Sequence, residues 1–133
     1  MIFLFKKKLM IKASNSLKKL IDKILIGISD VKGQNIEMID LRSIENRISD
    51  FYIVCSGTSN THVSAILESI KKKVSRALKE KPLNIEGTDN AEWILLDYID
   101  VVVHIFQKQV REFYNIEELW GDCKTNIVPI NKN

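Results

Sequence analysis

The sequence is poor in the residues that build disulfide-linked or metal-stapled folds. Its 133 residues include only two cysteines, Cys55 and Cys123, and two histidines. Two cysteines are too few for a disulfide-rich scaffold or for a structural zinc site of the four-cysteine kind. No apolar stretch reaches the roughly 18 residues that a membrane-spanning helix needs. We therefore expect a cytoplasmic protein that is stabilised by an ordinary hydrophobic core.

The length of the chain predicts a single domain with short extensions. Residues 1–5 are mostly apolar and are followed by three lysines, which reverses the order of charge and apolar run in a secretory signal. We predict a disordered extension over residues 1–13, a domain over 14–122 and a flexible tail over 123–133.

Charge is distributed unevenly along the chain. Residues 1–32 carry +6, residues 33–81 carry +2, residues 84–122 carry −7 and residues 123–133 carry +2, which leaves a net charge of +3. A net positive charge alone would favour an acidic partner such as nucleic acid. The −7 segment would instead repel phosphates, attract a basic protein surface and speed association with it.

The spacing of apolar residues predicts an α/β fold. Two amphipathic helices are predicted, one over residues 14–28 and one with an apolar stripe from residue 63 to 78. Strands are predicted at 36–41, 51–55, 84–86, 93–98 and 101–106, the last two as a hairpin, and short helical pieces at 109–114 and 115–121. This order indicates a mixed sheet of about five strands flanked by helices in one domain.

Neither histidine has a partner at metal-ligand spacing. His104 alternates along its strand with Val102 and Phe106, which favours a packed or hydrogen-bonded ring. A nucleophile pair of Cys55 and His104 remains an alternative. However, Cys55 lies in an apolar strand, where burial raises the pKa of a thiol and keeps it inert.

A strand followed by Gly57-Thr58-Ser59 and a helix is similar to the opening of nucleotidyltransferase folds, where a helix N-terminus holds a phosphate. Such enzymes also need paired carboxylates for two metal ions. Here the following helix offers Glu68 and then a lysine run, while Asp97 and Asp100 bracket a turn. We predict a nucleotidyltransferase-like fold without catalysis, cofactor or metal.

The aromatic residues point to a protein interface. Those from residue 93 to 120 fall in the −7 segment, whereas every lysine except Lys108 lies outside it, so direct nucleic-acid binding is not expected. RNA binding through the run from Lys71 to Lys81 stays as an alternative.

Tryptophan, tyrosine and arginine are enriched at binding hot spots. The predicted docking residues are Trp93, Leu95 and Asp97, which share a strand face, together with Arg111, Tyr114, Glu117 and Trp120. The competing interpretation is that both tryptophans fill the core.

Five segments in order resemble a known family. Residues 50–59 are similar to a family segment Asp-Tyr-Phe-Val-Ile-Ala-Ser-Gly-Thr-Ser, with Cys55 where the family usually has alanine. The other matching segments are residues 86–87, 92–98, 100–106 and 111–120. Over residues 17–122 the chain resembles the ribosomal silencing factor RsfS family, also called Iojap.

The resemblance implies a non-catalytic regulator of translation. Members are implied to bind ribosomal protein L14 on the intersubunit face of the large ribosomal subunit and to block joining with the small subunit. Organellar relatives are implied to act in large-subunit assembly. The partners expected here are therefore the large subunit through ribosomal protein L14 and, for the free protein, a second copy of the chain.

Overall fold

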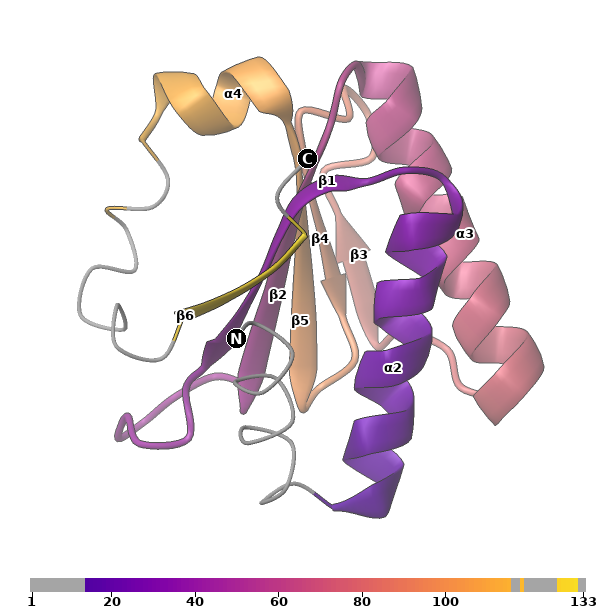
Figure 1. Cartoon of the computed structure of the whole chain (residues 1–133). Helices are drawn as coiled ribbons and strands as arrows, with labels where there is room; N and C mark the ends of the chain where they lie inside the picture. The colour runs from indigo at the N-terminus through magenta and orange to yellow at the C-terminus, as the bar shows by residue number, and fades with distance from the viewer. Residues whose placement is uncertain (1–13, 116–117, 119–126, 132–133) are drawn as a thin grey trace.

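The computed structural model describes residues 14–115, 118 and 127–131. Figure 1 shows the arrangement of the chain. The helices are α2 (Asn15–Asp30), α3 (Asn60–Leu78) and α4 (Lys108–Phe113). The strands are β1 (Gln34–Asp40), β2 (Phe51–Gly57), β3 (Asn84–Glu86), β4 (Trp93–Asp97), β5 (Val101–Gln107) and β6 (Ile127–Asn131).

Within the described residues the strands form one mixed sheet in the order β3-β4-β5-β2-β1-β6. Strands β2 and β5 are parallel, and the other neighbours are antiparallel. The prediction of a mixed sheet flanked by helices is confirmed, as is the β4–β5 hairpin. The sheet has six described strands instead of about five.

The additional strand is β6, which pairs antiparallel with β1 at an edge of the sheet. It lies within residues 123–133, where we expected a flexible tail, so that expectation was wrong for Ile127–Asn131. The run is short and contains Pro129, which lacks the N–H that a central strand must donate. At an edge, one side of the strand needs no partner, and proline is tolerated there. The predicted helical piece at 115–121 lies largely outside the described residues.

Helices α2 and α3 lie side by side on one face of the sheet (Figure 1). Their apolar stripes pack against every second residue of the strands. Ile24 of α2, Ile53 of β2 and Val103 of β5 are all fully buried in this core. Burying each such side chain stabilises the fold by about 1.5–3 kcal/mol. Ser14 Oγ accepts from the backbone N–H of Leu17 at 3.2 Å and caps the start of α2.

The opposite face of the sheet carries the alternate strand residues. Val54 and Phe106 are fully buried on it, and Tyr52 is half-buried. The short helix α4 lies at the carboxyl end of β2 and β5 on this side, because its Arg111 reaches Ser56 and Glu37 there. This second face, together with α4, holds most of the predicted docking residues that the structure describes.

Candidate protein-docking surface

Trp93 opens β4 and lies directly opposite Phe106 of β5. The two ring centroids are 4.8 Å apart, and the indole Nε1–H donates to His104 Nδ1 at 3.2 Å. Trp93 nevertheless remains 41% exposed. It is therefore neither a core tryptophan nor a free surface side chain: the sheet fixes its orientation while one side of the ring faces outward.

His104 is the buried partner that sets this orientation. The edge of the Tyr52 ring packs against it with the centroids 4.6 Å apart. Burial lowers the pKa of His104 to about 4, so the ring is neutral near pH 7. Because Nδ1 accepts from Trp93, the ring proton lies on Nε2. The prediction of a packed, hydrogen-bonded histidine is confirmed.

Leu95 and Asp97 share the face of Trp93, as the alternation of a strand predicts. They lie opposite His104 and Val102 of β5, and both are half-buried. Asp97 also has a local function, because its Oδ1 accepts from the backbone N–H of Ile99 at 2.7 Å in the hairpin turn. The three predicted residues of β4 therefore form one continuous strip.

Arg111 lies beneath the surface and not on it. It is only 6% exposed. Its guanidinium donates to the backbone oxygen of Asn35 at 2.9 Å, to Ser56 Oγ at 2.8 Å and to Glu37 Oε1 at 2.8 Å. A side chain held in this way cannot contact a partner directly. Its hydrogen bonds hold α4 against β1 and β2, so Arg111 supports the surface on which the other predicted docking residues lie.

Helix α4 ends at Phe113 and is followed directly by Tyr114, and these residues are 80% and 63% exposed. Their rings pack edge to face with centroids 4.9 Å apart. We predicted Tyr114 but not Phe113, although two adjacent aromatics at the end of a six-residue helix can hardly both turn inward. Glu117 and Trp120 lie outside the described residues.

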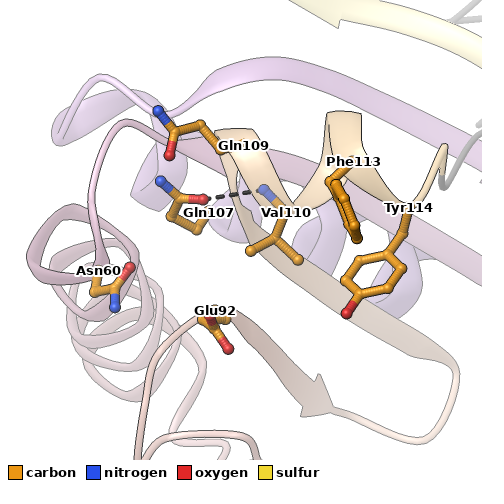
Figure 2. Close-up of a pocket in the computed structure, with 7 residues that line it drawn as sticks. All are labelled: Asn60, Glu92, Gln107, Gln109, Val110, Phe113 and Tyr114. Atoms are coloured by element: carbon orange, nitrogen blue, oxygen red, sulfur yellow. Dashed lines mark hydrogen bonds between the residues drawn. The ribbon is translucent and has the colours of Figure 1, made fainter.

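A shallow pocket of 460 Å³ runs along α4. Its lining residues are Asn60, Glu92, Gln107, Gln109, Val110, Phe113 and Tyr114. Figure 2 shows Glu92 and Asn60 across the pocket from the α4 side chains, with Gln107 Oε1 accepting from the backbone N–H of Val110. We call the strip of Trp93, Leu95 and Asp97, with this pocket, the aromatic surface.

The elements that carry the aromatic surface are acidic. The sheet and its connections, residues 33–59 and 84–115, contain ten Asp and Glu against four Lys and Arg, a charge of −6. Glu86 and Glu92 are both exposed beside the strip. A negative field around exposed aromatics suits a partner with a basic surface.

The loop that could hold a nucleotide phosphate is engaged within the protein. The backbone N–H of Thr58 donates to His62 Nδ1 at 2.8 Å, and His62 Nε2 donates to the Val31 carbonyl at 2.8 Å. Ser59 Oγ caps α3 by accepting from the N–H of His62 at 3.1 Å. The turn after β2 thus serves to join α2, β2 and α3.

The alternative of a Cys55–His104 nucleophile pair is wrong. Cys55 lies opposite Ile105 in the β2–β5 register and faces the helices, whereas His104 lies opposite Val54 on the other face. Burial raises the pKa of the fully buried thiol to about 12, against a smaller lowering by Arg111. Among the described residues no group of three or more His, Cys, Asp and Glu is placed to hold a metal ion.

The fold and the aromatic surface define a single α/β domain with a helical layer on one side of its sheet and an acidic, aromatic face on the other. The chain belongs to the RsfS family. The family model described as "Ribosomal silencing factor during starvation" matches residues 14–133.

No helix within the described ranges combines the length and apolar character that a bilayer crossing requires.

Known relatives are similar in both sequence and structure. The chain is 37% identical over 99 residues to a ribosomal silencing factor RsfS of Halalkalibacterium halodurans, an alignment that covers 74% of this chain and 83% of the relative. A crystal structure of a Chromobacterium violaceum protein matches with a TM-score of 0.71 and 33% identity, over 78% of this chain and 85% of that one. A Mus musculus protein named for mitochondrial assembly of the ribosomal large subunit is 32% identical over 78 residues, 57% of this chain and 34% of that protein.

Proposed function

We propose that this chain is a ribosomal silencing factor that binds the large ribosomal subunit through ribosomal protein L14 and blocks joining with the small subunit. Membership of the RsfS family supports the ribosomal role. The observation that carries the docking site is the Trp93 indole, which is fixed by His104 yet 41% exposed within an acidic face.

A fixed, exposed tryptophan is well suited to binding. Tryptophan and tyrosine dominate the hot spots of protein interfaces. A side chain that is already ordered before binding loses less conformational entropy in the complex. The hydrogen bond to His104 and the contact with Phe106 supply this order in advance. Trp93 is therefore the anchor of the proposed interface, with Tyr114 and Phe113 as second contacts.

The charge of the surface suits a ribosomal protein. Ribosomal proteins are generally basic because they lie on RNA. The exposed carboxylates of Glu86 and Glu92 would draw such a protein towards the strip. Complementary charge mainly raises the association rate, while buried aromatics slow dissociation. The two parts of the surface thus have separate functions in one interface.

The direct test uses purified ribosomal subunits. Large and small subunits are mixed with and without the protein, and complete ribosomes are separated by sedimentation. We expect the protein to lower the yield of complete ribosomes and Trp93→Ala to weaken binding to ribosomal protein L14 by about 2 kcal/mol, roughly 30-fold. Ile48→Ala is the matched control, because Ile48 is 82% exposed but lies in the β1–β2 connection. Equal yields of complete ribosomes in both mixtures would overturn the proposal.

Large-subunit assembly is the alternative that a relative's name favours. If this function dominates, cells lacking the protein accumulate incomplete large subunits during growth. If silencing dominates, large subunits mature normally and the defect is an excess of complete ribosomes under starvation. Sucrose-gradient profiles of growing and starved cells distinguish the two.

A nucleotidyltransferase activity is the less favoured alternative, because the Thr58 N–H is already engaged by His62. It predicts that a nucleoside triphosphate with magnesium raises the melting temperature. We expect no shift, and a shift that Trp93→Ala leaves intact would revive the enzymatic interpretation.

We also propose that a second copy of the chain covers the aromatic surface when the protein is free. Trp93, Phe113 and Tyr114 are all exposed, and exposed aromatic side chains gain free energy when a partner buries them. Sedimentation equilibrium of the wild type and of Trp93→Ala tests this. A wild-type monomer at every concentration would contradict it.

A further inference from the structure

A second pocket lies on the helical layer, between the end of α2 and the later half of α3. It has a volume of 330 Å³. Its lining residues are Asp30, Ser69, Lys72, Lys73, Arg76 and Ala77. The proposed docking to ribosomal protein L14 does not use it, since α2 and α3 cover the opposite face of the sheet. We call it the basic pocket.

Close packing of the two helices forms the wall of the basic pocket. A Cβ atom added at Gly27 would lie 2.9 Å from the Cα of Ile70, so only glycine permits this approach. Ser69 Oγ donates to the Gly27 carbonyl at 2.6 Å and joins the two backbones. The cations beside it are therefore carried on a fixed scaffold and not on a loop.

The charge in the basic pocket is only partly compensated. Lys73 Nζ lies 3.2 Å from the Asp30 carboxylate, so these two groups offset each other. Lys72 and Arg76 are both exposed, and within residues 14–115 no carboxylate lies within ion-pair distance of either. Two adjacent cations one turn apart on a helix repel each other unless an anion joins them.

The whole helical layer is basic. Residues 15–32 and 60–83 contain ten Lys and Arg against four Asp and Glu, a charge of +6. Cations near the end of α3 also suit the helix dipole, but the dipole does not account for their place in a concave pocket that Asp30 of α2 also lines. The sheet layer carries −6, so an anionic polymer would be repelled there and attracted here.

We propose that the basic pocket binds backbone phosphates of structured RNA through Lys72 and Arg76. A guanidinium can donate two parallel hydrogen bonds to one phosphate, and a lysine adds a point charge beside it. Ala77 is the one apolar side chain in the lining, so the pocket offers nothing to insert into a bilayer. The sequence favoured no nucleic-acid contact because the aromatics lie apart from the lysines. In the fold, Lys72, Lys73 and Arg76 of the lysine run line a pocket that contains no aromatic residue.

The test measures binding of a fluorescein-labelled RNA duplex of about 20 base pairs by anisotropy. Lys72→Gln with Arg76→Gln removes the two cations. Lys19→Gln with Lys23→Gln is the matched control, since it changes the net charge equally on α2 but away from the pocket lining. Circular dichroism and thermal melts confirm that both double variants are folded.

We expect the pocket variant to weaken RNA binding about tenfold and to reduce the slope of log K against log salt by roughly 1.8, two phosphates' worth. The control should weaken binding less than about threefold. Equal losses in both variants, or no binding by the wild type at about 50 mM salt, would overturn the proposal.

Two further arms separate this proposal from other outcomes. Pocket-dependent binding to phosphatidylserine vesicles without RNA binding would assign the pocket to a membrane and overturn the RNA proposal. The Trp93→Ala variant should bind RNA like the wild type, because Trp93 and the basic pocket lie on opposite sides of the sheet. If the wild type binds RNA through the basic pocket but does not block subunit joining, the docking proposal alone fails.

Discussion

The pairing of Trp93 with His104 depends on the protonation state of one ring. A neutral His104 offers Nδ1 as an acceptor for the indole N–H, whereas a charged ring carries protons on both nitrogens and cannot accept. Burial keeps the pKa of His104 at about 4 in the folded protein, against 6.5 for an ordinary histidine. The hydrogen bond from Trp93 is thus present at neutral pH and should break when His104 is protonated.

His104 should make the stability of the fold depend on pH. The unfolded chain takes up a proton as the pH falls through 6.5, while the folded chain does so only near pH 4. The free energy of unfolding should therefore fall by about 3 kcal/mol between these values. Urea denaturation at pH 7 and pH 4.5 measures the loss. His104→Gln keeps an acceptor without titrating, and an equal loss in this variant would contradict the assignment.

Arg111 should matter more for folding than for contact with a partner. Arg111→Met removes the cation from a largely buried pair with Glu37 and leaves that carboxylate without its charged donor. We expect a loss of about 3 kcal/mol in the free energy of unfolding, measured by urea denaturation. The double variant with Glu37→Leu should recover part of this loss. If Arg111→Met kept full stability and weakened only ribosome binding, Arg111 would be a contact residue after all.

The helices and strands differ in how far local sequence predicts them. Helices α2 and α3 follow from apolar spacing, and the β4–β5 hairpin follows from two β-prone runs around a turn. The strand order does not follow, because pairing of β1 with β6 joins residues far apart in the chain. Periodicity describes one element at a time and carries no information on which elements meet.

The aromatic surface could likewise be predicted only within single elements. Trp93, Leu95 and Asp97 share a face because a strand alternates, whatever the fold. The burial of Arg111 and the exposure of Phe113 depend on where α4 meets the sheet, which no local pattern specifies. The basic pocket likewise needs α2 and α3 to cross at Gly27.

The hairpin turn after β4 contains a strained residue. Ile99 has φ 76°, a left-handed conformation that β-branched residues rarely adopt. The turn is held by Asp97 Oδ1, which accepts from the Ile99 N–H, and by the Asp100 N–H, which donates to the Tyr98 carbonyl at 3.0 Å. The Ile99 side chain is 60% exposed, so packing contributes little to offset the strain.

Ile99→Gly should therefore stabilise the protein. Glycine adopts positive φ freely, and relief of strain outweighs its greater unfolded-state entropy by about 1 kcal/mol. Ile99→Ala removes the same apolar surface but keeps the Cβ atom, so it should gain less. Thermal melts of both variants decide the point, and equal effects would show that the exposed side chain, not the backbone, is responsible.

The whole molecule is electrically polarised across its two layers. The helical layer carries +6 and the sheet layer −6 over the described ranges 15–32 and 60–83 against 33–59 and 84–115. The net charge of +3 conceals this separation. A strong dipole orients a protein as it approaches a charged target and favours one face in the encounter. A basic ribosomal protein would therefore meet the aromatic surface first.

This polarity predicts which charges control the association rate. Glu86→Gln with Glu92→Gln removes two exposed carboxylates beside the aromatic strip and should slow association with ribosomal protein L14 about fivefold at low salt, with the dissociation rate little changed. Glu68→Gln with Glu80→Gln changes the net charge equally on the helical side and should not slow it. Stopped-flow measurements give both rates. The difference between the two variants should shrink as added salt shortens the Debye length, which is roughly 8 Å at 0.15 M. If both pairs slow association equally, net charge and not the acidic face would govern the encounter.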